Sequence, residues 1–155
     1  MADVKDLEPY AANTEGLTGV LTDIVSTMPN PVVFKVVGYK VNVFENVTQG
    51  DVLYSRSSDG QVGKAIANDT LDKAVVAGIA ETTVTAGNEV RVIVTGQVAV
   101  STSIDPGELY YLSASSTGSL TKTPPTTAGH YVTLVGEAGT SNQIVLKIRR
   151  PIQLR

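Results

Sequence analysis

The sequence predicts a mainly β protein in which two repeated units of short strands, barrel-like in form, pack together after an N-terminal arm or short helix. Three observations support this prediction. The apolar residues are mostly Val, Ile, Leu and Ala, the chain holds 14 Gly and 7 Pro, and several short segments recur in the same order. β-Branched side chains suit a half-buried pleated surface, and frequent Gly and Pro indicate tight turns between short strands.

Residues 1–31 differ in pattern from the rest of the chain. Apolar residues recur there at the i, i+3, i+4, i+7 spacing of one helix face: Leu17, Val20, Leu21, Ile24, Val25 and Met28. Asn13 or Thr14 is suited to cap such a helix, and Pro29 and Pro31 would end it. Two glycines early in the same stretch weaken a helix, so an extended arm is the alternative.

A strand is predicted over residues 32–44. Tyr39, Val41 and Val43 alternate with polar residues and therefore share one face. The earlier half of the segment is apolar on both faces, which is typical of a strand buried on both sides.

An internal repeat organises the remainder of the chain. Three glycine-containing segments recur in order, 50–54 as 107–111, 60–64 as 118–122 and 76–80 as 134–138, at offsets of 57, 58 and 58 residues. A later strand, 90–94, matches 144–148 at an offset of 54, which implies a loop about four residues shorter in the second copy. We therefore divide the chain into residues 1–31, a first β-unit at 32–103 that includes the leading strand, and a second β-unit at 104–155.

Composition excludes several classes of function. The chain has no cysteine, so disulfide scaffolds, thiolate metal sites and cysteine nucleophiles are excluded. Its net charge is −3 and its basic residues are scattered, which argues against a nucleic-acid partner. It has no apolar run of membrane-spanning length and no secretory signal pattern at the N-terminus, so we expect no membrane partner and synthesis in the cytoplasm.

Few residues carry catalytic chemistry. His130 is the single histidine, and no Gly-x-Ser-x-Gly motif accompanies it, so we expect no enzyme activity and no cofactor. The carboxylate pairs that we considered for calcium or acid–base chemistry are Asp69 with Asp72, and Asp51 with Glu108. Their spacing matches no EF-hand loop, and the simpler interpretation is a set of solvated charges beside turns.

Two further groups of residues have alternative interpretations. Tyr54, Tyr110 and Tyr111 lie at strand ends, where they either pack in the core or form a sugar-binding platform. Lys147 and Arg149 alternate with apolar residues near the C-terminus, and Arg150 and Arg155 add to this group. These four basic residues are either a solvated strand face or a contact for an acidic partner surface.

The repeated segments resemble a known family. Gly50-Asp51-Val52-Leu53-Tyr54, then 75–80 and 86–98, are similar in strand pattern to head-decoration (cement) proteins of tailed phages, of the β-tulip kind. Segments 107–113 and 122–125 of the second unit resemble modules found in such cement proteins and in phage fibres. The resemblance covers residues 47–154 and leaves residues 1–46 unmatched.

This resemblance implies a mechanical function in the virion. Such a protein would bind the outside of the capsid as a homotrimer, contact the major capsid protein and stabilise the shell. The implied contact residues are the apolar face Leu17, Val20, Leu21 and Ile24, together with the basic residues Lys147, Arg149 and Arg150. The alternative within the resemblance is a trimeric head- or tail-fibre module that attaches to the host surface.

Overall fold

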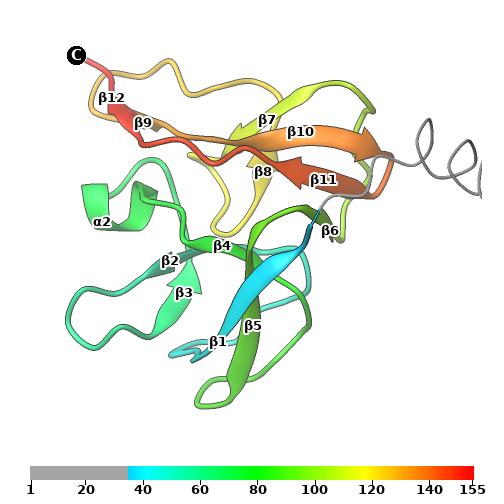
Figure 1. Ribbon diagram of the computed structural model, residues 1–155. Coiled ribbons are helices and arrows are strands. Elements are labelled where there is room, and N and C mark those ends of the chain that lie inside the picture. Colours follow the sequence, from blue (N-terminus) through cyan, green and yellow to red (C-terminus); the bar gives the residue numbers. More distant parts are fainter. Residues whose placement is uncertain (1–34) are drawn as a thin grey trace, which may run out of the picture. The chain divides into compact units, whose positions relative to one another are not determined.

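Short strands are the main regular secondary structure of the described chain. The computed structural model describes residues 35–155. The first sheet contains β1 (Val37–Asn42), β2 (Val52–Ser55), β3 (Val62–Lys64), β4 (Gly78–Ala80) and β5 (Glu89–Thr95). The second sheet contains β6 (Gln97–Ala99), β7 (Leu109–Leu112), β8 (Leu120–Thr121), β10 (Leu134–Thr140) and β11 (Gln143–Leu146). A two-stranded ladder joins β9 (Tyr131–Val132) to β12 (Ile152–Gln153), and α2 (Leu71–Ala74) is one turn of helix (Figure 1).

The prediction of a mainly β fold is confirmed, but the sheets are open, which corrects its barrel-like part. In the first sheet the edge strands are β1 and β3. They approach each other only through an isolated bridge between Val43, just after β1, and Val62 of β3. One bridge does not give the continuous ladder that a closed barrel requires.

The two sheets have the same strand order. It is β1-β5-β4-β2-β3 in the first and β6-β11-β10-β7-β8 in the second, and all neighbours are antiparallel. Pairing registers agree as well, because Leu53 pairs with Gly78 and Tyr110 pairs with Gly136. The second copy therefore has its own leading strand, β6, which begins at Gln97, upstream of the boundary at residue 104 inferred from the sequence.

The last repeated strand is offset differently from the sequence match. In the structure Ile93 pairs with Ile79, and Val145 pairs with Glu137, the residue equivalent to Ile79. Val145 lies 52 positions after Ile93, so the predicted offset of 54 is wrong and the second loop is six residues shorter. Side chains alternate along a strand with a period of two, and a slip of two residues therefore leaves the apolar pattern intact.

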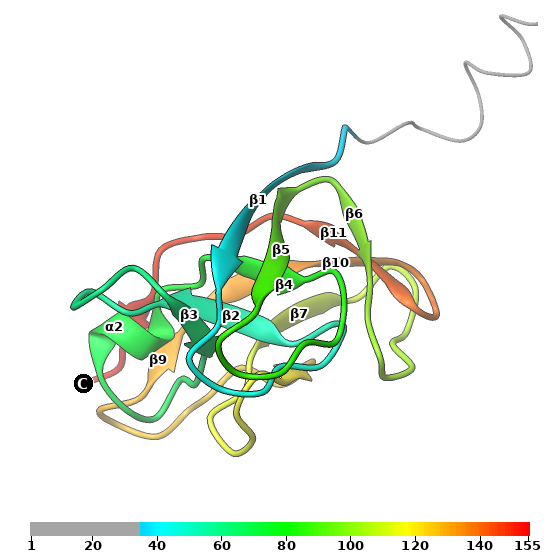
Figure 2. The same cartoon turned by 90° about the horizontal axis from the view of Figure 1, so that it is seen from below.

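One core joins the two sheets. It contains residues from both: Val52, Tyr54, Ile79 and Ile93 from the first, and Tyr110, Leu112, Val135, Ala138 and Ile144 from the second. Hydrogen bonds also cross between the copies, since the Ala67 amide donates to the Ser113 carbonyl at 3.0 Å and the Tyr131 amide donates to the Ala67 carbonyl at 2.8 Å. Residues 35–155 accordingly form a single unit (Figure 2).

The copies meet through non-equivalent faces. Four residues of the first sheet point into the shared core: Val52, Tyr54, Ile79 and Ile93. Their register equivalents in the second sheet are outside that core and half-buried or exposed: Leu109, Tyr111, Glu137 and Val145. The other face of the first sheet encloses a separate core around Leu53, Ala80 and Val92. The copies thus pack head-to-tail. The face of the first sheet that carries Val52 and Ile79 contacts a non-equivalent face of the second sheet, which carries Leu112 and Ala138.

The leading strand is less buried than its sequence suggests. Tyr39 and Val41 share a face, as predicted, because they pair with Val92 and Val90 of the second core. The first half of the predicted strand was expected to be buried on both faces, but Val36 and Val37 within it are 40% and 44% exposed. β1 is an edge strand, so only one of its sides is covered within residues 35–155.

Candidate interaction surface

The basic residues near the C-terminus continue the line of β11. Lys147 and Arg149 donate their backbone amides to the carbonyls of Val135 and Leu134, at 2.9 and 3.0 Å. This pairing holds the segment against β10 beyond the end of the regular strand. Lys147, Arg149 and Arg150 are all exposed, as expected from the alternation, and their role in contacting a partner stays a prediction.

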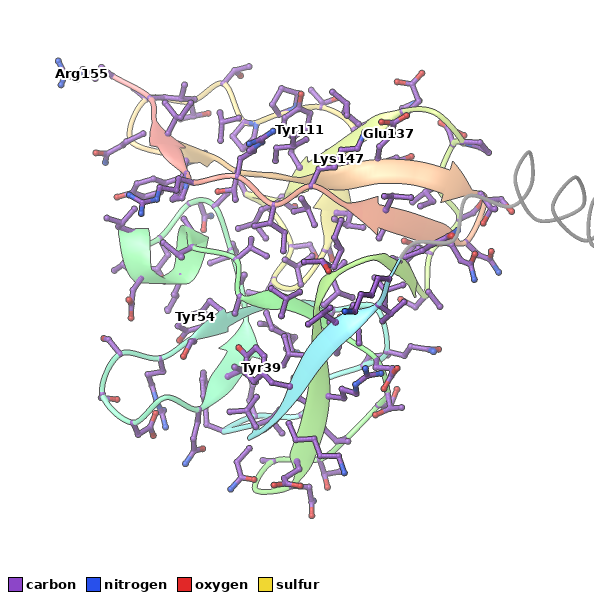
Figure 3. All side chains as sticks on the ribbon, viewed as in Figure 1. Tyr39, Tyr54, Tyr111, Glu137, Lys147 and Arg155 are labelled. Carbon is purple, nitrogen blue, oxygen red and sulfur yellow. The ribbon has the colours of Figure 1, made fainter. Side chains whose placement is uncertain are left out.

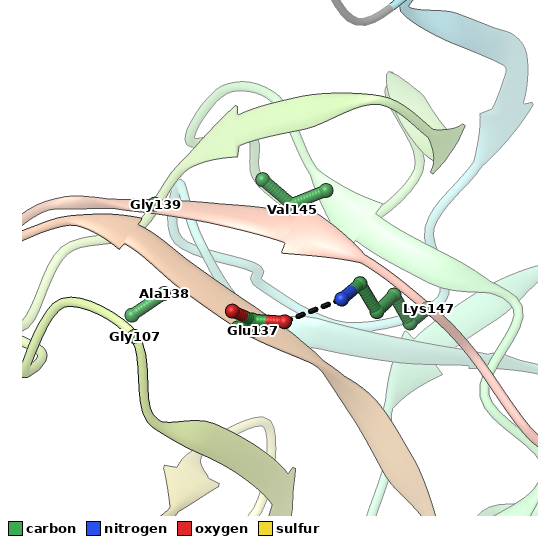
Figure 4. Close-up of a pocket in the computed structure, with 6 residues that line it drawn as sticks. All are labelled: Gly107, Glu137, Ala138, Gly139, Val145 and Lys147. Atoms are coloured by element: carbon green, nitrogen blue, oxygen red, sulfur yellow. Dashed lines mark hydrogen bonds and ion pairs between the residues drawn. The ribbon is translucent and has the colours of Figure 1, made fainter. Parts of the chain in front are cut away.

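Lys147 is ion-paired on the outward face of the second sheet. Its Nζ contacts the Glu137 carboxylate, and the two side chains lie across β10 and β11 beside a hollow of about 380 Å³ (Figure 4). Gly107, Ala138, Gly139 and Val145 complete the lining. Figure 3 shows the pair on the outside of the sheet. An exposed pair of this kind contributes at most about 1 kcal/mol, but it offsets the charge of Lys147.

Arg149 lies beside a second hollow, which we call the 76–149 groove. It has a volume of about 500 Å³ and is lined by Val76, Ala77, Val94 and Thr95 of the first copy and Leu146, Lys147, Ile148 and Arg149 of the second. The lining includes two cations and no carboxylate. Arg149 forms no ion pair with any residue of 35–155.

Exposed apolar side chains continue from the groove. Val37 pairs with Thr95 of the lining, and Val36 precedes it in the chain. Val75, 46% exposed, adjoins Val76. Isolated exposed apolar residues are ordinary, so these side chains add to the apolar character near the groove without marking a site by themselves.

The hollow beside Phe44 and Tyr54 is less suited to binding. The Arg56 guanidinium covers the Phe44 ring at 4.1 Å, and the Tyr54 ring meets Phe44 edge-on at 6.0 Å between centroids. Tyr54 is only 5% exposed, and burial raises the pKa of its hydroxyl. Tyr110 is also buried, with its hydroxyl accepting the Asp105 amide at 2.9 Å. Neither ring face is therefore open as a sugar-binding platform.

The carboxylates considered for metal or acid–base chemistry have local partners. Asp69 is paired with Lys73, which lowers the pKa of that carboxyl. Asp72 accepts a hydrogen bond from the Ser57 hydroxyl at 3.0 Å. Asp51 accepts the Thr48 amide at 2.8 Å, while partial burial raises its pKa. Within residues 35–155, no three acidic or histidine side chains gather in an arrangement that fits a metal ion.

His130 occupies a different environment. It is half-buried in a hollow lined mainly by serine, threonine and proline, and its backbone amide donates to the Thr127 carbonyl at 3.1 Å. The lining of that hollow contains no carboxylate to orient the imidazole.

The predicted apolar contacts Leu17, Val20, Leu21 and Ile24 lie outside the described residues. Sequence reasoning missed the apolar part of the groove, which includes Val76, Val94 and Ile148. These residues follow the pattern of core strands, and only the topology places them where two strands part. No helix within 35–155 is long and apolar enough to cross a membrane. No protein-family model matches the chain, and no curated protein matches it.

Proposed function

We propose that the protein is a non-enzymatic structural component of a phage virion that binds the outer surface of the capsid and stabilises it. Its partner in this proposal is the major capsid protein, and it acts as a homotrimer after synthesis in the host cytoplasm. Neither a cofactor nor a nucleic acid takes part.

The main support is the way in which the two copies are joined. A shared core and hydrogen bonds between the copies give one body with no flexible linker between its sheets. A protein that ties shell subunits together has to resist relative movement of its halves, and close packing provides that resistance. The resemblance of residues 47–154 to decoration proteins supports the same function.

Cosedimentation tests the proposal. Full-length protein would be mixed with expanded, undecorated heads of the phage that encodes it, and with unexpanded heads as the control. We expect saturable, stoichiometric binding to expanded heads and a higher temperature of DNA release from the decorated particles. Failure to bind heads, together with binding to host cells, would favour the fibre-module alternative.

A further inference from the structure

The 76–149 groove forms where both sheets lose a neighbour. β4 pairs with β5 only through Ile79 with Ile93 and Ala80 with Val92. Beyond that point Thr95 pairs with Val37 of β1, while Ala77 donates its amide to Leu53 of β2. On the opposite wall β11 pairs with β6 no further than Val145, followed by one hydrogen bond from Leu146 to Gly96. The segment after Leu146 therefore has one open edge.

Two backbone amides at this groove have no acceptor within residues 35–155. Ala77 donates to the Leu53 carbonyl of β2, and the preceding amide, that of Val76, has no acceptor within residues 35–155. Lys147 and Arg149 both donate toward β10, so the amide of Ile148, between them, is directed toward the groove. Neither Val76 nor Ile148 donates a hydrogen bond to any group in this part of the chain.

Neither donor has an acceptor within residues 35–155, and Val76 is only 7% exposed. Nearly all buried amides in folded proteins are paired with protein or water. Donors on two facing walls, above apolar side chains, match the requirements of an extended guest chain, which supplies carbonyl acceptors on both of its edges.

Charge restricts the guest further. Arg149 is the cation of the groove that forms no ion pair within residues 35–155, whereas Lys147 is paired with Glu137 on the outward face of the sheet. The described hollow around Tyr54 differs, since Glu45 and Asp69 offset Lys64 and Lys73 there. A guest with carboxylates flanking apolar residues is complementary to the 76–149 groove.

We propose that the 76–149 groove binds an extended, acidic segment of the capsid protein. Carbonyl groups of the segment accept the amides of Val76 and Ile148, its apolar side chains pack on Val94, and a carboxylate pairs with Arg149. The volume of about 500 Å³ falls in the range of roughly 300–1,000 Å³ that is usual for binding sites. The identity of the partner rests on the proposed function, whereas the chemistry of the guest rests on the groove alone.

Binding to heads tests the partner. Arg149→Glu places a carboxylate at the groove, and Arg155→Glu makes the same charge change at the C-terminus, far from it (Figure 3). We expect Arg149→Glu to weaken binding to expanded heads about ten-fold or more at low salt, and Arg155→Glu less than two-fold. High salt should reduce the difference. If wild-type protein binds heads and both variants bind equally well, the groove is not the contact, although the proposed function stands.

A peptide tests the chemistry independently of heads. The probe is a blocked heptapeptide in which valine alternates with glutamate, and the control has lysine in place of glutamate. In amide NMR spectra of the full-length protein, we expect the acidic peptide to shift the Val76 and Ile148 resonances most, with no such effect from the basic peptide or in Arg149→Glu. Shifts elsewhere, or none at saturating peptide, would overturn the inference even if the protein decorates heads.

Discussion

The glycines at the centre of β4 and β10 should be indispensable for packing, and alanine tests this directly. A Cβ atom at Gly78 would lie 2.3 Å from the Ile93 carbonyl oxygen, and one at Gly136 would lie 2.2 Å from the Val145 carbonyl oxygen. Contacts of Cβ below 3.0 Å are essentially never observed, so each strand would have to move by at least 0.7–0.8 Å. Neither glycine has a positive φ. Close approach of the neighbouring strand is therefore the reason for glycine.

The magnitude follows from two opposing effects. Overpacking in a core costs about 1–3 kcal/mol, and each strained cross-strand hydrogen bond adds about 0.5–1.5 kcal/mol. Alanine also restricts the unfolded chain, which returns about 0.4–1 kcal/mol. We expect Gly78→Ala and Gly136→Ala each to destabilise the protein by about 1–3 kcal/mol, with Gly78 the more sensitive because its Cβ would also lie 2.6 Å from Val92 Cγ1.

Urea unfolding measures the effect. With a slope of about 2 kcal/mol per molar, a loss of 2 kcal/mol lowers the midpoint by about 1 M. Gly139→Ala is the matched control on β10, because its nearest neighbour is the flexible Gln97 side chain at 3.1 Å and its φ is not positive. It should change stability by less than about 0.5 kcal/mol. Midpoints for Gly78→Ala and Gly136→Ala that match this control would refute the reasoning.

Three further predictions concern stability and assembly. Thr133→Val should cost about 1–3 kcal/mol in urea unfolding, because the buried Thr133 hydroxyl donates to the Ala74 carbonyl at 2.9 Å and Thr133→Ser would retain that bond. The hydrogen bond from Arg56 lowers the pKa of the Asp59 carboxyl in the folded protein. The pair therefore stabilises the fold at pH values above the ordinary carboxyl pKa of about 4. This contribution is lost as the pH falls through the lowered pKa of folded Asp59. Asp59→Asn should therefore flatten the acid limb of urea midpoints measured from pH 6 to 2, and an unchanged limb would contradict the assignment. Light scattering should give a homotrimer, and a stable monomer near 16.2 kDa would contradict this expectation. A truncated chain that begins at Asn30 should stay folded but lose binding to heads, and a truncated chain that unfolds would contradict that second expectation.

The strand repeat could be read from the sequence because its turns constrain residue type. Gly50 and Gly107 both adopt a positive φ, at 88° and 83°, and both donate their amide to the carbonyl of the equivalent alanine, Ala80 or Ala138. Left-handed backbone favours glycine strongly, so the same turn in both copies leaves the same residue in the sequence. Such anchors allowed the repeated segments of the two units to be matched in order.

The register of the last strand lacked an anchor of this kind. Residues 90–94 and 144–148 are each four apolar residues and one basic residue, and such a pattern can be matched again after a slip of two residues, which keeps each side chain on the same face. The structure decides between the matches through Gly78 and Gly136, which contact Ile93 and Val145 respectively. A contact between strands thus determined what local sequence left open.

The candidate groove was predicted in part for a related reason. Arg149 was identifiable because a charged residue on a strand has to reach solvent. Val76 and Ile148 were not, because an apolar residue in a strand looks the same whether its backbone is paired or free. Pairing depends on where neighbouring strands end, and this depends on contacts between residues 76–80, 92–95 and 143–149 that are distant in sequence.

The head-to-tail contact of the copies explains why the groove is at their junction and why it occurs once among the described residues. If equivalent faces met, any opening between the sheets would be related to a second one by symmetry. Here non-equivalent faces of the two sheets meet, so the end of β5 faces the segment after β11. The face of the first sheet that contacts the second copy carries Ile79, and the equivalent face of the second sheet carries Glu137 at the same position. A charged residue at that position, paired with Lys147, opposes the addition of a third copy in the same way. The described residues thus form a two-sheet body with an asymmetric opening at the junction, and that opening is the place where we expect the partner chain to bind.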